Sequence, residues 1–139
     1  MSLRAIPLII IPFIIYNVIA LLGGDVPADD IFRKPLFNLP MLSGARWTFS
    51  WSDLLILLVT LIVLFAELVK ATYTSSVSLV DHGLSMLVFI ACIVEFLIVP
   101  QAATSVFFFI MTATLVDVVA GFMIGIRTAR RDLNIGSDH

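Results

Sequence analysis

Four long apolar runs dominate this sequence and limit what it can fold into. They cover about residues 5–22, 52–72, 82–99 and 102–127, and few charged residues interrupt them. A helix needs about 20 apolar residues to cross roughly 30 Å of bilayer hydrocarbon. The sequence therefore predicts one domain over residues 1–139, an all-α integral membrane protein folded as a four-transmembrane-helix bundle.

The composition agrees with a membrane protein and excludes several other classes. Hydrophobic residues make up 60% of the chain and charged residues 13%, against about 45–50% and about 25% in soluble domains. A total of 8 lysines and arginines and a net charge of −2 argue against a nucleic-acid partner. The single cysteine, Cys92, cannot form an internal disulfide and is expected to pack as an apolar residue. We expect no metal and no cofactor, and the lipid bilayer as the main partner.

Prolines mark the ends of the predicted helices. Pro100 and Gln101 separate the third and fourth runs, because proline cannot continue a helix and restricts the residue before it. These two runs are therefore expected to form a tight antiparallel pair. Pro7 and Pro12 lie in the first half of the first run, where they predict a kink or a loose first turn.

The first run also has features of a signal peptide. Arg4 supplies a positive start, and residues 18–20 resemble a cleavage site. However, the apolar stretch is longer than the usual signal-peptide core of about 7–15 residues. We interpret this run as a permanent span.

The distribution of lysine and arginine predicts the orientation in the membrane. With four spans, both termini and the loop after the second span share one side. That side carries Arg4, Lys70, Arg127, Arg130 and Arg131, and the other side carries Arg33, Lys34 and Arg46. We therefore expect a multi-pass protein of the cell membrane, a bacterial inner membrane, with both termini and the tail 128–139 in the cytoplasm.

The predicted extracytoplasmic loop, about residues 23–51, contains a possible β-hairpin. Aromatic residues alternate with polar ones at its end: Trp47, Phe49 and Trp51 against Arg46, Thr48 and Ser50. This period of two is typical of a half-buried strand. Residues 37–41 are a candidate partner strand, with Ser43-Gly44 as the turn and Pro40 at an edge. A compatible alternative is an interfacial aromatic belt that anchors the second span. Asp53 is a candidate cap for the second helix.

Ionisable residues inside the spans are the most informative ones for function. A charge at mid-span costs about 2.5–3.5 kcal/mol on insertion scales, so such residues normally face protein or water. At about 1.5 Å per residue, the polar residues fall into two layers. The cytoplasmic half contains Glu67, Lys70, His82 and Asp117, and the outer half contains Asn17 and Glu95, with Thr60 as a further candidate.

Two helix faces are expected to pack against other helices. On the second span, Asp53, Thr60, Glu67 and Thr74 are spaced by seven, which predicts one continuous stripe. On the fourth span, Ala113, Asp117, Gly121 and Gly125 are spaced by four. The two glycines let another backbone approach closely, either within the chain or from a second subunit.

Several interpretations of the buried acids stay open. Glu67, Glu95 and Asp117 could be structural, hydrogen-bonded within the bundle, or could contact another subunit. They could instead bind ions or protons, or another ligand. His82 could be a capping or interface residue, or a ligand. The arginines after the fourth span, Arg127, Arg130 and Arg131, are expected to bind anionic lipid headgroups.

The sequence contains no motif that indicates an enzyme: no phosphate-binding glycine loop, no zinc-binding His-Glu-x-x-His and no Gly-x-Ser-x-Gly elbow. We expect a small non-enzymatic membrane protein that oligomerises or acts as an accessory subunit of a membrane complex. The alternative is a proton- or cation-linked transporter or channel that uses Asp117 and Glu67. A third class, lipid or quinone binding between spans, has no specific motif. What contacts the face of Asp117, Gly121 and Gly125 should discriminate between the first two.

Overall fold

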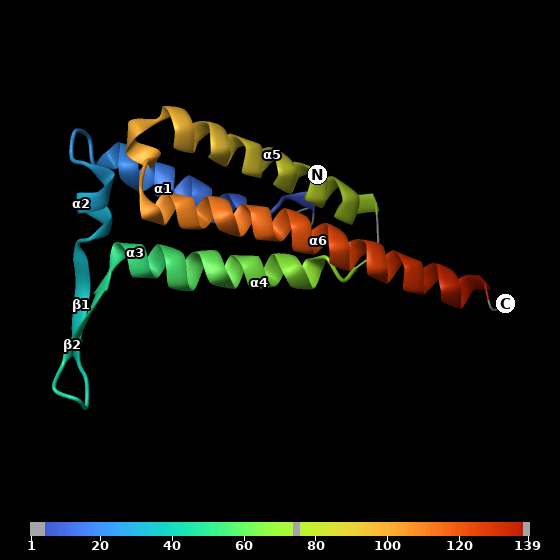
Figure 1. Cartoon of the computed structure of the whole chain (residues 1–139), viewed down its shortest axis with the longest axis horizontal. Helices are drawn as coiled ribbons and strands as arrows, with labels where there is room; N and C mark the ends of the chain where they lie inside the picture. Colours follow the sequence, from blue (N-terminus) through green and yellow to red (C-terminus); the bar gives the residue numbers. More distant parts are fainter. Residues whose placement is uncertain (1–4, 74–75, 138–139) are drawn as a thin grey trace.

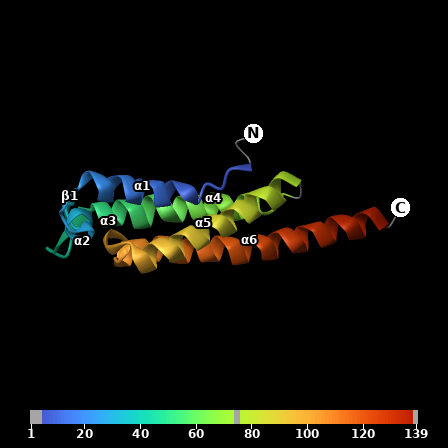
Figure 2. The ribbon, with the colours of Figure 1, turned by 90° about the horizontal axis from the view of Figure 1, so that it is seen from above.

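The computed structural model describes residues 5–73 and 76–137. In chain order the elements are α1 (Ile10–Leu22), α2 (Ala28–Phe32), β1 (Pro35–Pro40), β2 (Arg46–Ser50), α3 (Trp51–Asp53), the π-helix η2 (Leu54–Thr60), α4 (Leu61–Lys70), α5 (Ser76–Ile98), the 3-10 helix η3 (Pro100–Ala102) and α6 (Ser105–Ser137). The long helices lie side by side in an elongated bundle, and the two strands project from one end of it (Figure 1). Figure 2 shows the same bundle from above.

Within the described residues, three helical stretches are long and apolar enough to cross a membrane. They are Trp51–Lys70, which joins α3, η2 and α4, then Leu79–Ile98 in α5 and Ser105–Gly136 in α6. The helix α1 is also apolar but has only 13 residues, about 20 Å at 1.5 Å per residue. A mostly helical membrane protein is therefore supported, with three clear candidate spans and a shorter fourth helix beside them.

The loose start expected from the prolines of the first run is present. We expected the first span to cover residues 5–22, but the α-helix begins only at Ile10. Residues 5–9 form turns instead, in which the Ile10 N–H donates to the Pro7 carbonyl oxygen at 3.2 Å. Pro12 sits in the first turn of α1, where its missing N–H breaks no helical hydrogen bond.

The last two long helices, α5 and α6, are longer than predicted: α5 begins earlier and α6 ends later. The expected break is confirmed, because α5 ends at Ile98 and η3 separates it from α6. However, α5 begins at Ser76 rather than at residue 82, and α6 ends at Ser137 rather than at residue 127. Residues 128–137, which we assigned to a tail, continue α6 beyond the rest of the bundle (Figure 1). The apolar run predicts only the part of each helix that lipid would surround, whereas the backbone hydrogen bonds of α5 and α6 continue beyond the apolar residues.

The predicted β-hairpin is confirmed. β1 and β2 pair antiparallel, with Phe37 opposite Phe49 and Leu39 opposite Trp47. Gly44 has a φ of 88°, a left-handed conformation that suits glycine, and so closes the turn at the predicted position. In a two-stranded sheet both strands are edges, which removes the conflict posed by a proline inside β1.

Asp53 contributes to the cap of the second helix, as expected, but the N-cap residue itself is Ser50 and Asp53 is its partner three residues later. The Asp53 carboxylate accepts a hydrogen bond from the Ser50 N–H at 2.9 Å, and the Asp53 N–H donates to the Ser50 hydroxyl oxygen at 3.4 Å. This reciprocal pair is a capping box, which satisfies two backbone donors at the helix start. The cap also joins β2 directly to α3 without an intervening loop.

The predicted seven-residue stripe on this helix is wrong at its first position. The π-helix η2 separates Asp53 from Thr60, and its wider i→i+5 turns do not return a seven-residue spacing to one face. The Thr60 hydroxyl donates to the Leu55 carbonyl oxygen at 2.7 Å within this helix. Thr60 and Glu67, which an α-helical segment separates, are both fully buried. Thr74, the last member of the stripe, lies outside the described residues.

The hairpin end of the bundle is closed by a hydrogen-bonded tyrosine. Tyr16 is buried, stacks on Phe32 and donates its hydroxyl proton to the Gln101 carbonyl oxygen at 2.7 Å. Its hydroxyl oxygen also lies 2.6 Å from that of Thr104. The Gln101 side chain accepts a hydrogen bond from the Ala28 N–H at 2.9 Å. These contacts hold α1, α2 and the α5–α6 connection together. The opposite end of the bundle contains a different set of polar residues.

Candidate functional site

A group of ionisable side chains is buried between the helices at the end of the bundle opposite the hairpin. We call it the polar cluster: Glu67 and Lys70 from α4, Asp81 and His82 from α5, and Asp117 from α6. All but Lys70 are buried. The cluster therefore brings together the four residues expected in the cytoplasmic-half layer, with Asp81 added to them.

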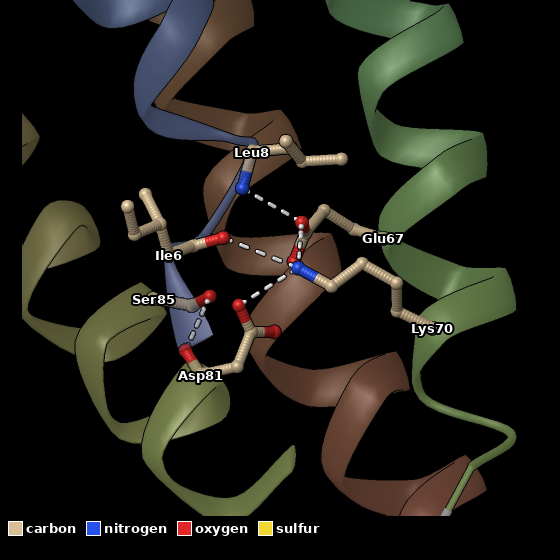
Figure 3. A network of polar contacts seen from close by, with 6 residues as sticks. All are labelled: Ile6, Leu8, Glu67, Lys70, Asp81 and Ser85. Atoms are coloured by element: carbon tan, nitrogen blue, oxygen red, sulfur yellow. Dashed lines mark hydrogen bonds and ion pairs between the residues drawn. The ribbon is translucent and has the colours of Figure 1, made fainter. Parts of the chain in front are cut away.

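Lys70 lies between two carboxylates. Its ammonium nitrogen is 3.1 Å from Glu67 Oε1 and 2.9 Å from Asp81 Oδ1 (Figure 3). The Lys70 side chain is 26% exposed, whereas those of its two partners are 0% and 2% exposed. The long lysine stem thus carries a positive charge from the edge of the bundle into a buried acidic site.

The same residues bind the backbone of the segment that precedes α1. The Leu8 N–H donates to Glu67 Oε1 at 2.7 Å, and the Lys70 ammonium donates to the Ile6 carbonyl oxygen at 3.2 Å (Figure 3). Because this segment is not helical, its backbone N–H and carbonyl groups have no partners within a helix and are satisfied by these side chains instead. Glu67 and Lys70 therefore have a structural role in holding this segment, although the second carboxylate oxygen of Glu67, Oε2, has no partner among the described residues.

Asp117 and His82 have no such explanation. Both are buried, and among the described residues no well-formed hydrogen bond reaches either Asp117 oxygen or either His82 ring nitrogen, although the Ser85 hydroxyl lies close to the Asp117 carboxyl group. The nearby Ser85 hydroxyl donates to the Asp81 carbonyl oxygen instead, at 3.0 Å. Buried polar groups without partners are rare and costly in folded proteins, and they call for a functional explanation.

Gly121 provides the space that these two side chains share. A Cβ atom on Gly121 would lie 2.9 Å from His82 Cε1 and 3.8 Å from Asp117 Oδ1. A Cβ on Gly125 would lie 3.7 Å from His82 Nε2. The imidazole also packs against the ring of Phe122, with 5.1 Å between centroids. The absence of a side chain at Gly121 therefore lets the His82 ring lie against α6, whereas at Gly125 a Cβ atom would make only an ordinary contact.

The small-residue face of α6 is used inside the chain. Ala113, Asp117 and Gly121 are all buried, and α5 provides the histidine that covers the two glycines. The Ala71 carbonyl oxygen, at the end of α4, lies 3.8 Å from the Cβ position of Gly125. This face therefore contacts neighbouring helices of the same chain, one of the two arrangements that the glycine spacing allowed.

The polar cluster contains more acids than bases. Its three carboxyl groups face a single ammonium group, and Asp81 and Asp117 are both close enough to Glu67 for their charges to act on it. An uncompensated charge in an apolar interior is very unfavourable, so such groups are neutralised by a proton or by another cation. Among the described residues, no set of three or more His, Cys, Asp or Glu side chains has the geometry of a metal site.

The outer-half residues are only partly brought together. The Asn17 side-chain amide donates to Glu95 Oε2 at 3.3 Å and to the Phe13 carbonyl oxygen at 2.9 Å. Asn17 and Glu95 are half-buried on the surface between α1 and α5. Thr60 does not join them, because its hydroxyl is bonded within its own helix.

The remaining predicted residues lie at the surface. Arg127, Arg130 and Arg131 are exposed on the part of α6 that extends from the bundle, and their contact with lipid headgroups stays a prediction. Arg4 lies outside the described residues.

Asp81 is the cluster residue that the layer prediction missed. It directly precedes His82, and an acid at the start of a span can pair with the lysine that ends the span before it, which is the signal that could have identified it. The backbone contacts of residues 6 and 8 leave no such signal in the sequence.

Comparisons of the chain with protein-family models, with curated proteins and with solved structures give no match.

Proposed function

We propose that the chain is a four-span protein of a cell membrane with both termini in the cytoplasm. Residues 5–9 extend α1 along α4, as the bond from the Leu8 N–H to Glu67 indicates, so residues 5–22 together supply a longer apolar segment than the helix alone. The orientation follows from the basic residues at the ends of the spans. With this topology the polar cluster lies in the cytoplasmic half of the membrane.

We propose that this protein moves protons, as a small proton-linked transporter or channel, and that the polar cluster is where they bind. The observation that carries the proposal is the burial of Asp117 and His82 without partners beside the same glycine. A carboxylate and an imidazole can each accept and release a proton. Lys70 reaches the edge of the bundle and so connects the cluster to the cytoplasmic surface. In this scheme Glu67, Lys70 and Asp81 hold the site together, while Asp117 and His82 exchange protons.

Proton flux into liposomes tests this proposal. The full-length protein is reconstituted with a pH-sensitive dye inside the vesicles, and a potassium diffusion potential drives the flux. We expect flux above that of protein-free liposomes, and we expect Asp117→Asn and His82→Gln to reduce it to the protein-free level. The matched control is Asp25→Asn, which removes a carboxylate from an exposed loop position and should leave flux unchanged. Flux that persists in a well-folded Asp117→Asn variant would contradict the proposal.

Infrared spectroscopy of the same proteoliposomes separates a proton from a small cation as the ligand. A protonated carboxyl group has a carbonyl stretch that a carboxylate lacks. We expect such a band to change with pH, to be absent in Asp117→Asn, and to be indifferent to sodium and potassium. A band that responds to sodium at constant pH would identify a cation site instead.

A specific surface also supports a role in assembly. Asn17 and Glu95 are polar, lie within apolar helices and are only half-buried between α1 and α5. Side chains of this kind form hydrogen bonds between membrane helices. We propose that this surface contacts a second copy or a helix of a larger complex, in which the protein acts as an accessory subunit.

The mass of the particle in mild detergent tests the assembly proposal. We expect the wild-type protein to be larger than a monomer and the double variant Asn17→Leu, Glu95→Leu to be monomeric. Thr112→Val, which alters an exposed polar side chain of α6, is the matched control and should keep the wild-type mass. A wild-type protein that is strictly monomeric and co-purifies with nothing would rule out this role.

A further inference from the structure

The β-hairpin leaves the bundle across the direction of the helices. Figure 1 shows β1 and β2 extending sideways from one end of the bundle, beyond the helix that begins with α3. In Figure 2, turned by 90°, the hairpin is seen nearly along its length. If the helices cross the membrane, a hairpin in this direction runs parallel to the membrane surface.

The hairpin has two chemically different faces. Paired residues of antiparallel strands share a face, and successive residues alternate between faces. The aromatic face carries Phe37, Leu39, Trp47 and Phe49, and the polar face carries Asn38, Pro40, Arg46 and Thr48. Phe37 stacks on Phe49 with 4.8 Å between ring centroids, and the Thr48 hydroxyl donates to the Asn38 side chain.

Most of the aromatic face is not covered by the rest of the described chain, although Phe49, next to the bundle, is buried. Phe37 and Trp47 are 47% and 42% exposed, and Leu42 at the tip of the hairpin is fully exposed. An isolated two-stranded hairpin is at best marginally stable in water. Its aromatic face therefore needs an apolar surface beside it to stabilise the pairing.

The connection to the helix indicates what that surface is. β2 ends at Ser50, and the candidate span begins at the next residue, Trp51. The aromatic face is thus continuous with the end of a membrane-spanning segment, at the level where that segment leaves the lipid. Tryptophan and other amphipathic aromatic side chains favour this interfacial layer, and Arg46 on the polar face suits contact with anionic headgroups.

We propose that the hairpin lies flat on the outer surface of the bilayer, with its aromatic face in the interfacial lipid and its polar face toward water. The occupant of the aromatic face is lipid, rather than a second copy of the chain or another protein. This arrangement prevents the second span from sliding or tilting, because the hairpin resists movement of its first residue in either direction. The inference rests on the membrane topology proposed above and does not depend on proton binding.

Fluorescence quenching tests this inference, because the chain has only two tryptophans. Trp51→Phe leaves Trp47 as the single fluorophore of the full-length protein in liposomes. We expect phosphatidylcholine with bromines high on its acyl chains to quench most of the Trp47 emission, bromines near the chain ends to quench less, and aqueous iodide to quench little. Trp47→Phe, which leaves Trp51 at the helix start, is the positive control for interfacial depth.

A neighbouring position provides the matched control. In a Trp47→Phe, Trp51→Phe background, Thr48→Trp places the fluorophore on the polar face, one residue away. We expect the reverse pattern there, with strong quenching by iodide and weak quenching by brominated lipid. Iodide quenching of Trp47 would place the aromatic face in water and overturn the proposal. Protection of Trp47 from both quenchers would show that protein covers the face, which would also overturn it.

Discussion

Lys70→Ala is expected to lower the free energy of unfolding by about 3–5 kcal/mol, the usual cost of removing one partner from a buried ion pair. The substitution leaves the carboxylates of Glu67 and Asp81 without the only ammonium group that contacts them among the described residues. It also removes the donor that satisfies the Ile6 carbonyl oxygen. Reversible unfolding of the detergent-solubilised protein by sodium dodecyl sulfate measures the effect.

Two comparisons make this result specific to the cluster. Lys34→Ala, which alters the other lysine of the chain, is expected to change stability by less than about 0.5 kcal/mol because its side chain is exposed. Combining Lys70→Ala with Glu67→Gln should recover part of the loss, because one uncompensated carboxylate is then neutral. Equal effects of Lys70→Ala and Lys34→Ala would show that Lys70 does not neutralise the buried acids.

Gly121→Ala is expected to destabilise the protein by about 1–3 kcal/mol, which is typical of overpacking a close contact. The added Cβ would lie 2.9 Å from the His82 ring, which is itself held against Phe122. Elsewhere in a helix the same substitution is favourable, because alanine has a helix propensity better than that of glycine by up to about 1 kcal/mol. A decrease in the free energy of unfolding therefore indicates that the added methyl group meets His82, whereas an increase would indicate that it does not.

The other helical glycines form a graded set of controls. Added Cβ atoms on Gly83 and Gly136 would meet nothing within 4 Å, so alanine at either position should be neutral or stabilising. Gly125→Ala makes only ordinary contacts, the nearest at 3.7 Å, and should be tolerated. Adding His82→Ala to Gly121→Ala should remove most of the penalty. A Gly121→Ala protein as stable as Gly83→Ala would contradict the packing described for His82.

Features that depend on neighbouring residues were predictable from the sequence. Pro100 located the break between α5 and α6, the alternation of aromatic and polar residues located the hairpin, and Asp53 marked a helix start. Spacing along a helix also placed Glu67 beside Lys70. In each case the interaction is local, so its pattern is visible in a short stretch of sequence.

Features that depend on distant contacts were not predictable. The bond from the Leu8 N–H to Glu67 joins residues 59 apart, and the contact of Tyr16 with Thr104 joins residues 88 apart. Depth along the membrane normal indicated which residues could meet, but it gave no lateral position, so it could not show that Asn17 and Glu95 are bonded to each other while the Thr60 hydroxyl is bonded within its own helix. The π-helix η2 was also not predicted, because the apolar run over Leu54–Thr60 is equally compatible with an α-helix.

The length of α6 has a practical consequence. Its 33 residues span about 50 Å, far more than the hydrocarbon thickness, and the ten residues after Arg127 account for about 15 Å of this. A fluorescent reporter or affinity tag fused after this helix would be carried by a rigid helical extension and oriented by it. Distances measured from such a label would therefore report the tilt of α6 directly, without the blurring that a flexible linker introduces.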